Sequence, residues 1–151
     1  MGSFVLGGTN GEDSMAEQVA VAHKPSGILS AGLFAGALAV IANVVILYFT
    51  RPLAPAMLPL NLAPVVIWTL IGTFGATLAY RFIAARAAAP DRTFVIVALI
   101  ALIISFAPDI ALLRNPSPMF GEVTASGVYS LMAMHVIAAA IIVPTLIRRS
   151  K

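Results

Sequence analysis

Four polar residues whose side chains can bind a ligand lie within otherwise apolar stretches of this sequence. They are Asn43, Ser105, Asp109 and His135. Together they offer an amide, a hydroxyl, a carboxylate and an imidazole, and a neutral imidazole is also a good axial ligand for a metal. Ser105, Asp109 and His135 are the residue types of a hydrolytic triad, but their spacing alone does not establish triad geometry.

The apolar stretches that contain these residues are long enough to cross a membrane. They cover residues 27–50, 62–82, 93–113 and 126–147, and a helix needs about 20 residues to span a hydrocarbon core. Hydrophobic residues make up 60% of the 151 residues and charged residues 10%, and the mean hydropathy is +1.00. Because backbone groups in lipid must pair within their own segment, we predict an all-α, integral membrane, four-helix antiparallel transmembrane bundle.

Basic residues mark one side of the predicted bundle. Only Arg51 and Arg114 lie on the other side, whereas seven share the side of the chain termini: Lys24, Arg81, Arg86, Arg92, Arg148, Arg149 and Lys151. Cytoplasmic loops are enriched in Lys and Arg, so we predict a multi-pass protein of the inner or plasma membrane with cytoplasmic N- and C-termini. The net charge of +3 is explained by this orientation, and we expect no nucleic-acid partner.

A polar segment, residues 1–26, precedes the four-helix domain at residues 27–149. It carries Glu12, Asp13 and Glu17 and lacks the basic-then-apolar pattern of a signal peptide. We expect a cytoplasmic tail. Met1 and Met15 both remain open as the start of the natural chain.

Small residues line one face of the first predicted helix. Gly32, Gly36 and Ala39 are spaced so that they share a face with Asn43. A Gly-x-x-x-Gly pattern lets two membrane helices approach closely. We therefore expect this face to contact another helix, either within the bundle or in another subunit, and Gly36→Leu to reduce assembly.

Three further features leave alternatives open. The proline-rich segment 52–64 either extends along the membrane interface or a partner, or caps the bundle tightly. Pro108 predicts a kink or an end of the third helix near Phe106. A stripe on the second helix either lines a polar path or packs with its hydroxyls on i−4 carbonyl groups, and it consists of Thr69, Thr73 and Thr77.

The alternating helix directions bring the four polar residues toward the outer half of the bundle. The first and third spans run outward, so Asn43, Ser105 and Asp109 lie toward their outer ends. His135 lies about 13 Å from the outer end of the fourth span, at about 1.5 Å per residue. Polar groups in a bilayer usually face the bundle interior or water. We therefore predict that the four converge, with Asn43 and Ser105 as the partners of the imidazole.

Three interpretations of this cluster remain open. In the first, Asn43 and His135 hydrogen-bond across helices while Asp109 caps a helix or reaches the interface. In the second, the cluster binds a small ligand or a lipid headgroup. In the third, His135 is the axial ligand of a haem or a chlorophyll-type pigment. A haem held by two histidines is not expected, because the other histidine, His23, lies outside the first span.

Motifs of known enzymes are absent from the sequence. It has no cysteine, no His-Glu-x-x-His, no Gly-x-Ser-x-Gly and no phosphate-binding loop. We therefore expect no enzymatic activity and no dedicated metal site. Four spans also lack the inverted repeat that is typical of secondary transporters.

Three segments resemble an uncharacterised bacterial family of small four-helix integral membrane proteins, a domain of unknown function. They are Arg92-Thr-Phe-Val-Ile-Val-Ala-Leu, Ser105-Phe-Ala-Pro-Asp109 and Leu131-Met-Ala-Met-His135-Val-Ile-Ala-Ala-Ala. Asn43 is a further point of similarity, and the resemblance covers residues 27–149. It implies the four-helix fold and a role for His135, but no activity.

These observations favour a non-catalytic accessory or assembly subunit of a larger membrane complex. Its partners would be the lipid bilayer and other membrane protein subunits. The alternative is a stand-alone four-helix protein that binds or transports a small ligand or a lipid, or a pigment- or haem-binding subunit that uses His135.

Overall fold

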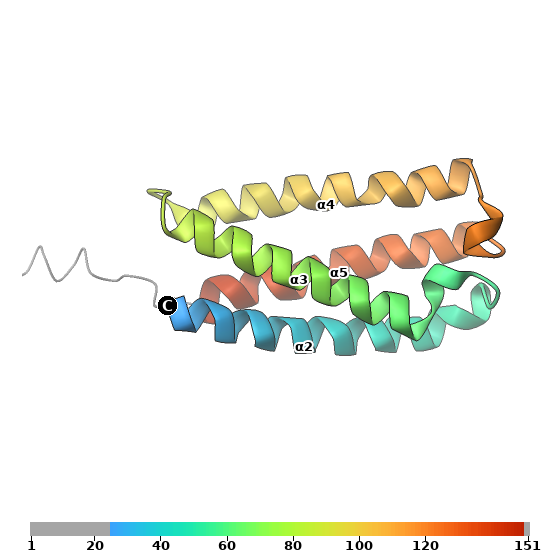
Figure 1. The fold of residues 1–151 in the computed structure, drawn as a ribbon, viewed down its shortest axis with the longest axis horizontal. Helices are drawn as coiled ribbons and strands as arrows, with labels where there is room; N and C mark the ends of the chain where they lie inside the picture. The colour runs from blue at the N-terminus through green and yellow to red at the C-terminus, as the bar shows by residue number, and fades with distance from the viewer. Residues whose placement is uncertain (1–24, 150–151) are drawn as a thin grey trace, which may run out of the picture.

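The structure, a computed structural model, describes residues 25–149 and consists there of four long helices joined by short turns. Their bounds are α2 Pro25–Thr50, α3 Leu62–Ala84, α4 Pro90–Arg114 and α5 Ala125–Arg149. Successive helices run in opposite directions (Figure 1), and each is long and apolar enough to cross a membrane. The predicted all-α antiparallel bundle is therefore confirmed. The predicted tail, residues 1–26, lies almost wholly outside the described residues.

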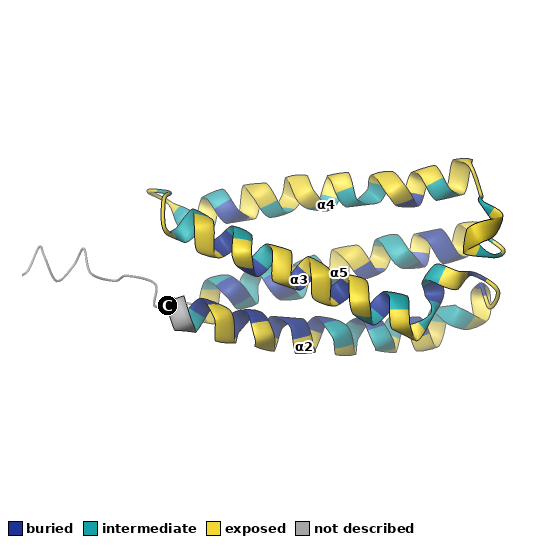
Figure 2. Ribbon diagram, in the orientation of Figure 1, coloured by how far each residue is buried: buried dark blue, intermediate teal, exposed yellow. Residues whose placement is uncertain are grey.

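Large apolar side chains cover the outside of the bundle. Among the most exposed are Leu33 at 79%, Ile103 at 69% and Phe74 at 65%, and Figure 2 shows exposed positions along the length of every helix. In water this surface would be strongly unfavourable, whereas in hydrocarbon it matches the solvent. The chain is therefore a membrane protein whose helices contact lipid.

Helix α2 packs against both α3 and α5. Its glycines face α3: a Cβ atom at Gly32 would lie 2.4 Å from Thr77 Oγ1, and one at Gly36 would lie 3.2 Å from Thr73 Cγ2. The threonine hydroxyls are turned back onto their own helix, since Thr77 donates to the Thr73 carbonyl group at 2.8 Å. The stripe therefore packs rather than lining a path.

Ala31, Ala35 and Ala39 of α2 are buried in the core at the end of the bundle where α2 begins and α5 ends, with Ile142 and Leu146 of α5. The same core holds the contact between α3 and α4, where the rings of Tyr80 and Phe94 lie 4.8 Å apart. The Tyr80 hydroxyl donates a hydrogen bond of 2.7 Å to the Asp91 carboxylate in the first turn of α4. These contacts fix α4 to α3 beside the turn that joins them.

The proline-rich segment caps the end of the bundle where α2 ends and α3 begins, which is the predicted outer end. It forms two short 3-10 turns, η1 Arg51–Leu53 and η2 Leu58–Leu60. Ala54, Met57 and Leu60 are at most 1% exposed and pack on the outer ends of α2, α3 and α5. Met57 also forms a bridge with Gly121 of the second outer loop, which contains the 3-10 turn η3 Pro118–Phe120. Of the two alternatives for this segment, the structure has the tight cap.

Helix α4 is the least buried of the four helices. Only Phe94 and Asp109 of its residues are buried, and its contacts are mainly with α5. Figure 1 shows α3 leaving α4 beyond their shared turn and crossing toward the outer end of α2. Pro108 does not end α4, which continues to Arg114. The outer half of α4 is thus supported chiefly by α5.

Candidate functional site

Asp109 of α4 and His135 of α5 form an ion pair between neighbouring helices. Asp109 Oδ2 lies 3.5 Å from His135 Nδ1, and the carboxylate side chain is 9% exposed against 42% for the imidazole. Asp109 lies five residues before the end of α4, and His135 lies ten residues after the start of α5. These intervals correspond to about 8 Å and about 15 Å of helix, so the pair lies inside the apolar span.

Hydrogen bonding on the imidazole assigns its two nitrogen atoms different roles. Nδ1 lies 2.8 Å from the Leu131 carbonyl oxygen, and a carbonyl oxygen can only accept, so Nδ1 carries a proton in this bond. Nε2 is then free to accept a hydrogen bond when the ring is neutral, or to donate one when it is protonated. The ring edge is further oriented by Phe106 of α4, at 6.5 Å between ring centroids.

The exposure of His135 results from incomplete coverage by neighbouring helices. Val128, Ile142 and Leu146 lie seven or eleven positions away, hence on the same face of α5. They are only 0%, 6% and 0% exposed. Along α5, this face is therefore buried both before and after His135. At His135 itself, the neighbouring helices leave the side chain partly exposed.

The Asp109 carboxylate lacks a full set of hydrogen bonds. Oδ2 is buried without a hydrogen-bond partner, because the 3.5 Å approach of Nδ1 is long and that nitrogen already donates to Leu131. A buried acceptor without a donor is costly. The pair can therefore bind an incoming group at two atoms. Asp109 Oδ2 accepts a hydrogen bond, and His135 Nε2 accepts or donates one according to its protonation.

Asn43 belongs to a different contact, between α2 and α3. Its Nδ2 donates to Thr69 Oγ1 at 2.9 Å, and that hydroxyl donates to the Val65 carbonyl group at 2.7 Å. The Asn43 Oδ1 atom is buried without a partner. Sequence reasoning did not assign Thr69 to Asn43, although both residues lie on the faces that pack together through Gly32, Gly36 and the threonine stripe.

Ser105 is not part of the pair either. Its hydroxyl donates to the Leu102 carbonyl oxygen of the same helix at 2.7 Å. The expectation that Asn43 and Ser105 are the partners of His135 was therefore wrong: each hydrogen-bonds elsewhere, and the imidazole contacts Leu131 and Asp109. Because Ser105 donates its proton to Leu102 and not to the imidazole, Ser105, Asp109 and His135 do not form a triad in this structure.

The residues of the pair are suited to hydrogen bonding. No group of three or more His, Cys, Asp or Glu residues within residues 25–149 is placed to hold a metal ion. Two polar side chains, one buried and one partly open, can instead receive a hydrogen-bonding group from a second molecule within the membrane.

Comparison with known proteins identifies the family of the chain but no activity. No curated protein and no solved structure matches the chain significantly. The resemblance noted for residues 27–149 is confirmed and extends slightly beyond these limits. A model of a family of unknown function, DUF6069, matches residues 23–151, and the chain therefore belongs to this family.

Proposed function

We propose that this protein is a non-catalytic accessory subunit of a membrane complex, and that the Asp109–His135 pair is where a partner span docks. The observation that carries the proposal is the opening of the helix packing at His135, whose side chain is 42% exposed beside a buried carboxylate. Ionisable groups at membrane depth are expensive unless they are paired or covered. A second membrane helix at this opening would cover both.

The geometry of the pair specifies the chemistry of the docking group. Asp109 Oδ2 has no hydrogen-bond partner, so the partner should present a donor, such as a hydroxyl, amide or ammonium group. Nε2 of His135 can pair with a second polar atom of the same partner. A purely apolar helix would leave both atoms unsatisfied and would bind less well.

The charge distribution supports an orientation with both termini in the cytoplasm. Arg81, Arg86, Arg92, Arg148 and Arg149 lie at one end of the bundle, and Arg51 and Arg114 lie at the other. By the positive-inside rule the first end is cytoplasmic, in the inner or plasma membrane. The Asp109–His135 pair would then lie in the outer half of the bilayer.

Cysteine labelling in intact cells should report this orientation. The chain has no native cysteine, so single Ser117→Cys and Ser150→Cys variants carry one reactive site each. An impermeant maleimide should label position 117 from outside and position 150 only after the cells are opened. External labelling at position 150 would overturn the orientation.

Substitutions of His135 should separate a docking role from a purely structural one. His135→Gln keeps a donor for the Leu131 carbonyl group, so the tagged protein should still copurify with its partner in mild detergent. His135→Leu should lose the partner and cost the bundle about 1 kcal/mol of unfolding free energy, the scale of the one intramolecular hydrogen bond, to Leu131, that it removes. Native mass spectrometry measures partner retention, and thermal unfolding measures stability.

Leu33→Ala is the matched control, because Leu33 is 79% exposed on α2, the helix without substantial contact with α4. It should leave partner binding unchanged. A wild-type protein that purifies only as a monomer or homo-oligomer would refute the accessory role. If His135→Leu retains the partner as well as the wild type does, the partner docks at a surface other than the Asp109–His135 pair.

A second candidate function is ligand or pigment binding at the same pair. It is favoured by the hydrogen bond from Nδ1 to Leu131, because histidines that ligate metals usually anchor one ring nitrogen on a carbonyl group and present the other. A haem or chlorophyll-type pigment would give the purified protein a visible absorption band that His135→Gln and His135→Leu both abolish. The partner-docking role predicts no such band.

A further inference from the structure

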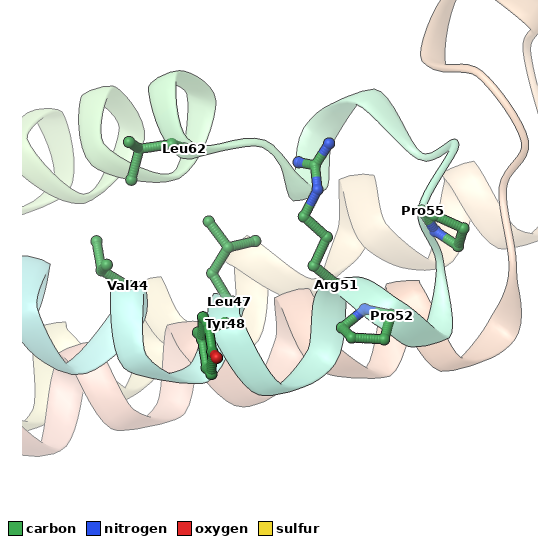
Figure 3. A pocket seen from close by; sticks show the side chains of 7 residues that line it. All are labelled: Val44, Leu47, Tyr48, Arg51, Pro52, Pro55 and Leu62. Carbon is green, nitrogen blue, oxygen red and sulfur yellow. The ribbon is translucent and has the colours of Figure 1, made fainter.

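A groove with a single cation at one end lies at the outer ends of α2 and α3. It has a volume of about 530 Å³, within the range of small-ligand sites. Apolar side chains and prolines line most of it: Val44, Leu47, Tyr48, Pro52, Pro55 and Leu62. Figure 3 shows Arg51 extending from the end of α2 toward the start of α3, between Leu62 and Pro55.

Hydrogen bonds hold the guanidinium of Arg51 in place. Nη1 donates to the Leu60 carbonyl oxygen at 2.8 Å and to Asn61 Oδ1. Asn61 is itself fixed, because its Nδ2 donates to the Leu58 carbonyl group at 2.7 Å. Both bonds of the guanidinium use Nη1, so the N–H groups on Nη2 and Nε are available to another acceptor.

The positive charge of Arg51 is not balanced within the described chain. Its two acceptors, a carbonyl and an amide oxygen, are neutral, and no carboxylate among residues 25–149 forms an ion pair with it. A preoriented guanidinium with free N–H groups is well suited to a phosphate, which it can bind through two parallel hydrogen bonds. The cation end of the groove is therefore complementary to an anionic headgroup.

The apolar part of the groove runs from Arg51 toward the membrane centre, as the acyl chain of a lipid does. Val44 lies seven residues before Arg51 on α2, which is about 10 Å along the helix axis and toward the membrane centre. Leu62 lies opposite, at the first turn of α3. An acyl chain that follows α2 into the bilayer would thus place its phosphate near Arg51, where α2 ends.

We propose that this groove is a binding site for an anionic phospholipid, with the phosphate on Arg51 and one acyl chain along Val44 and Leu62. The site is independent of the Asp109–His135 pair, which lies on α4 and α5. It would attach one lipid to the cap that closes the outer end of the bundle, because Pro52 and Pro55 of the cap form one wall of the groove.

Native mass spectrometry of the full chain tests this site. The delipidated protein is mixed with phosphatidylglycerol or with phosphatidylcholine of the same acyl chains. We expect one retained phosphatidylglycerol and about tenfold lower retention of phosphatidylcholine, because a charge-assisted pair is lost or weakened by the choline group. Arg51→Gln should reduce phosphatidylglycerol to the level of phosphatidylcholine.

Arg114→Gln is the matched control, since it removes the other arginine from the outer end of the bundle and changes the net charge equally. It should leave the preference intact. Equal effects of the two substitutions, or equal retention of both lipids by the wild type, would overturn the proposal and indicate lipid bound only by general attraction to the outer surface.

A second variant keeps the test decisive if Arg51→Gln fails to fold. Val44→Trp fills the apolar part of the groove and leaves Arg51 in place, so it should reduce retention of phosphatidylglycerol. Unchanged retention would overturn the site. Glycerol phosphate, which has the phosphate but no acyl chain, should compete poorly, and strong competition would show that the groove itself is not used.

Discussion

Gly32→Ala should destabilise the bundle by about 1–3 kcal/mol, the usual cost of overpacking a tight contact. An added Cβ would lie 2.4 Å from Thr77 Oγ1 and 2.7 Å from Thr77 Cγ2, so α2 and α3 would have to separate. Gly32→Leu and Gly36→Leu should be worse, because their longer side chains displace the helix backbone further. Thermal unfolding in detergent, followed through the fluorescence of Trp68, measures the loss.

Matched glycines on α3 provide the control. A Cβ atom at Gly72 or Gly75 meets nothing within 4 Å, so Gly72→Ala and Gly75→Ala should unfold at or above the wild-type temperature. Thr77→Ala removes both atoms nearest to Gly32 and should restore part of the stability lost in Gly32→Ala. Additive losses in the double variant would mean that Gly32 and Thr77 are not in contact.

Gly121→Ala should release the outer cap and cost about 1–3 kcal/mol, the scale of a strongly strained residue. Gly121 has φ of 74° and ψ of −154°, a backbone conformation that is essentially restricted to glycine. A Cβ atom there would also lie 2.1 Å from the Ala56 carbonyl oxygen. The bridge between Met57 and Gly121 should therefore break.

Opening of the cap can be detected by a cysteine at position 57. Met57 is 0% exposed, so Met57→Cys should react slowly with an impermeant maleimide, and faster once Gly121→Ala is added. Leu58→Cys, at a position that is 52% exposed, should react quickly in both backgrounds. Glu122→Ala, beside Gly121 and exposed, is the control substitution. Slow labelling of position 57 in Gly121→Ala would show that the glycine is dispensable for the cap.

The sequence was sufficient for the fold because its signals are local. Four apolar stretches of membrane-spanning length and the requirement for internal backbone pairing leave few alternatives to a helical bundle. The small-residue face of α2 was likewise visible in the spacing of Gly32 and Gly36. The spacing did not identify the helix opposite, which the structure shows to be α3 with its threonine stripe.

The candidate site could be predicted only in part. Residue type and depth singled out Asp109 and His135, which the structure places in contact, but they also suggested Asn43 and Ser105 as partners of the imidazole. Asn43 instead pairs with Thr69, and Ser105 turns back onto Leu102. Depth along a helix is readable from the sequence, whereas the direction in which a side chain points across the bundle depends on the rotation of each helix.

The sequence by itself thus determined the membrane environment, the four helices and the positions at which polar groups interrupt them. Only the tertiary structure decided that α4 separates from α3, that the packing opens at His135, and that the prolines fold into a cap beside Arg51. The reason is physical: burial in lipid is set by each segment's own composition, but pairing is set by the mutual rotation and spacing of helices, which arise from contacts far apart in the chain.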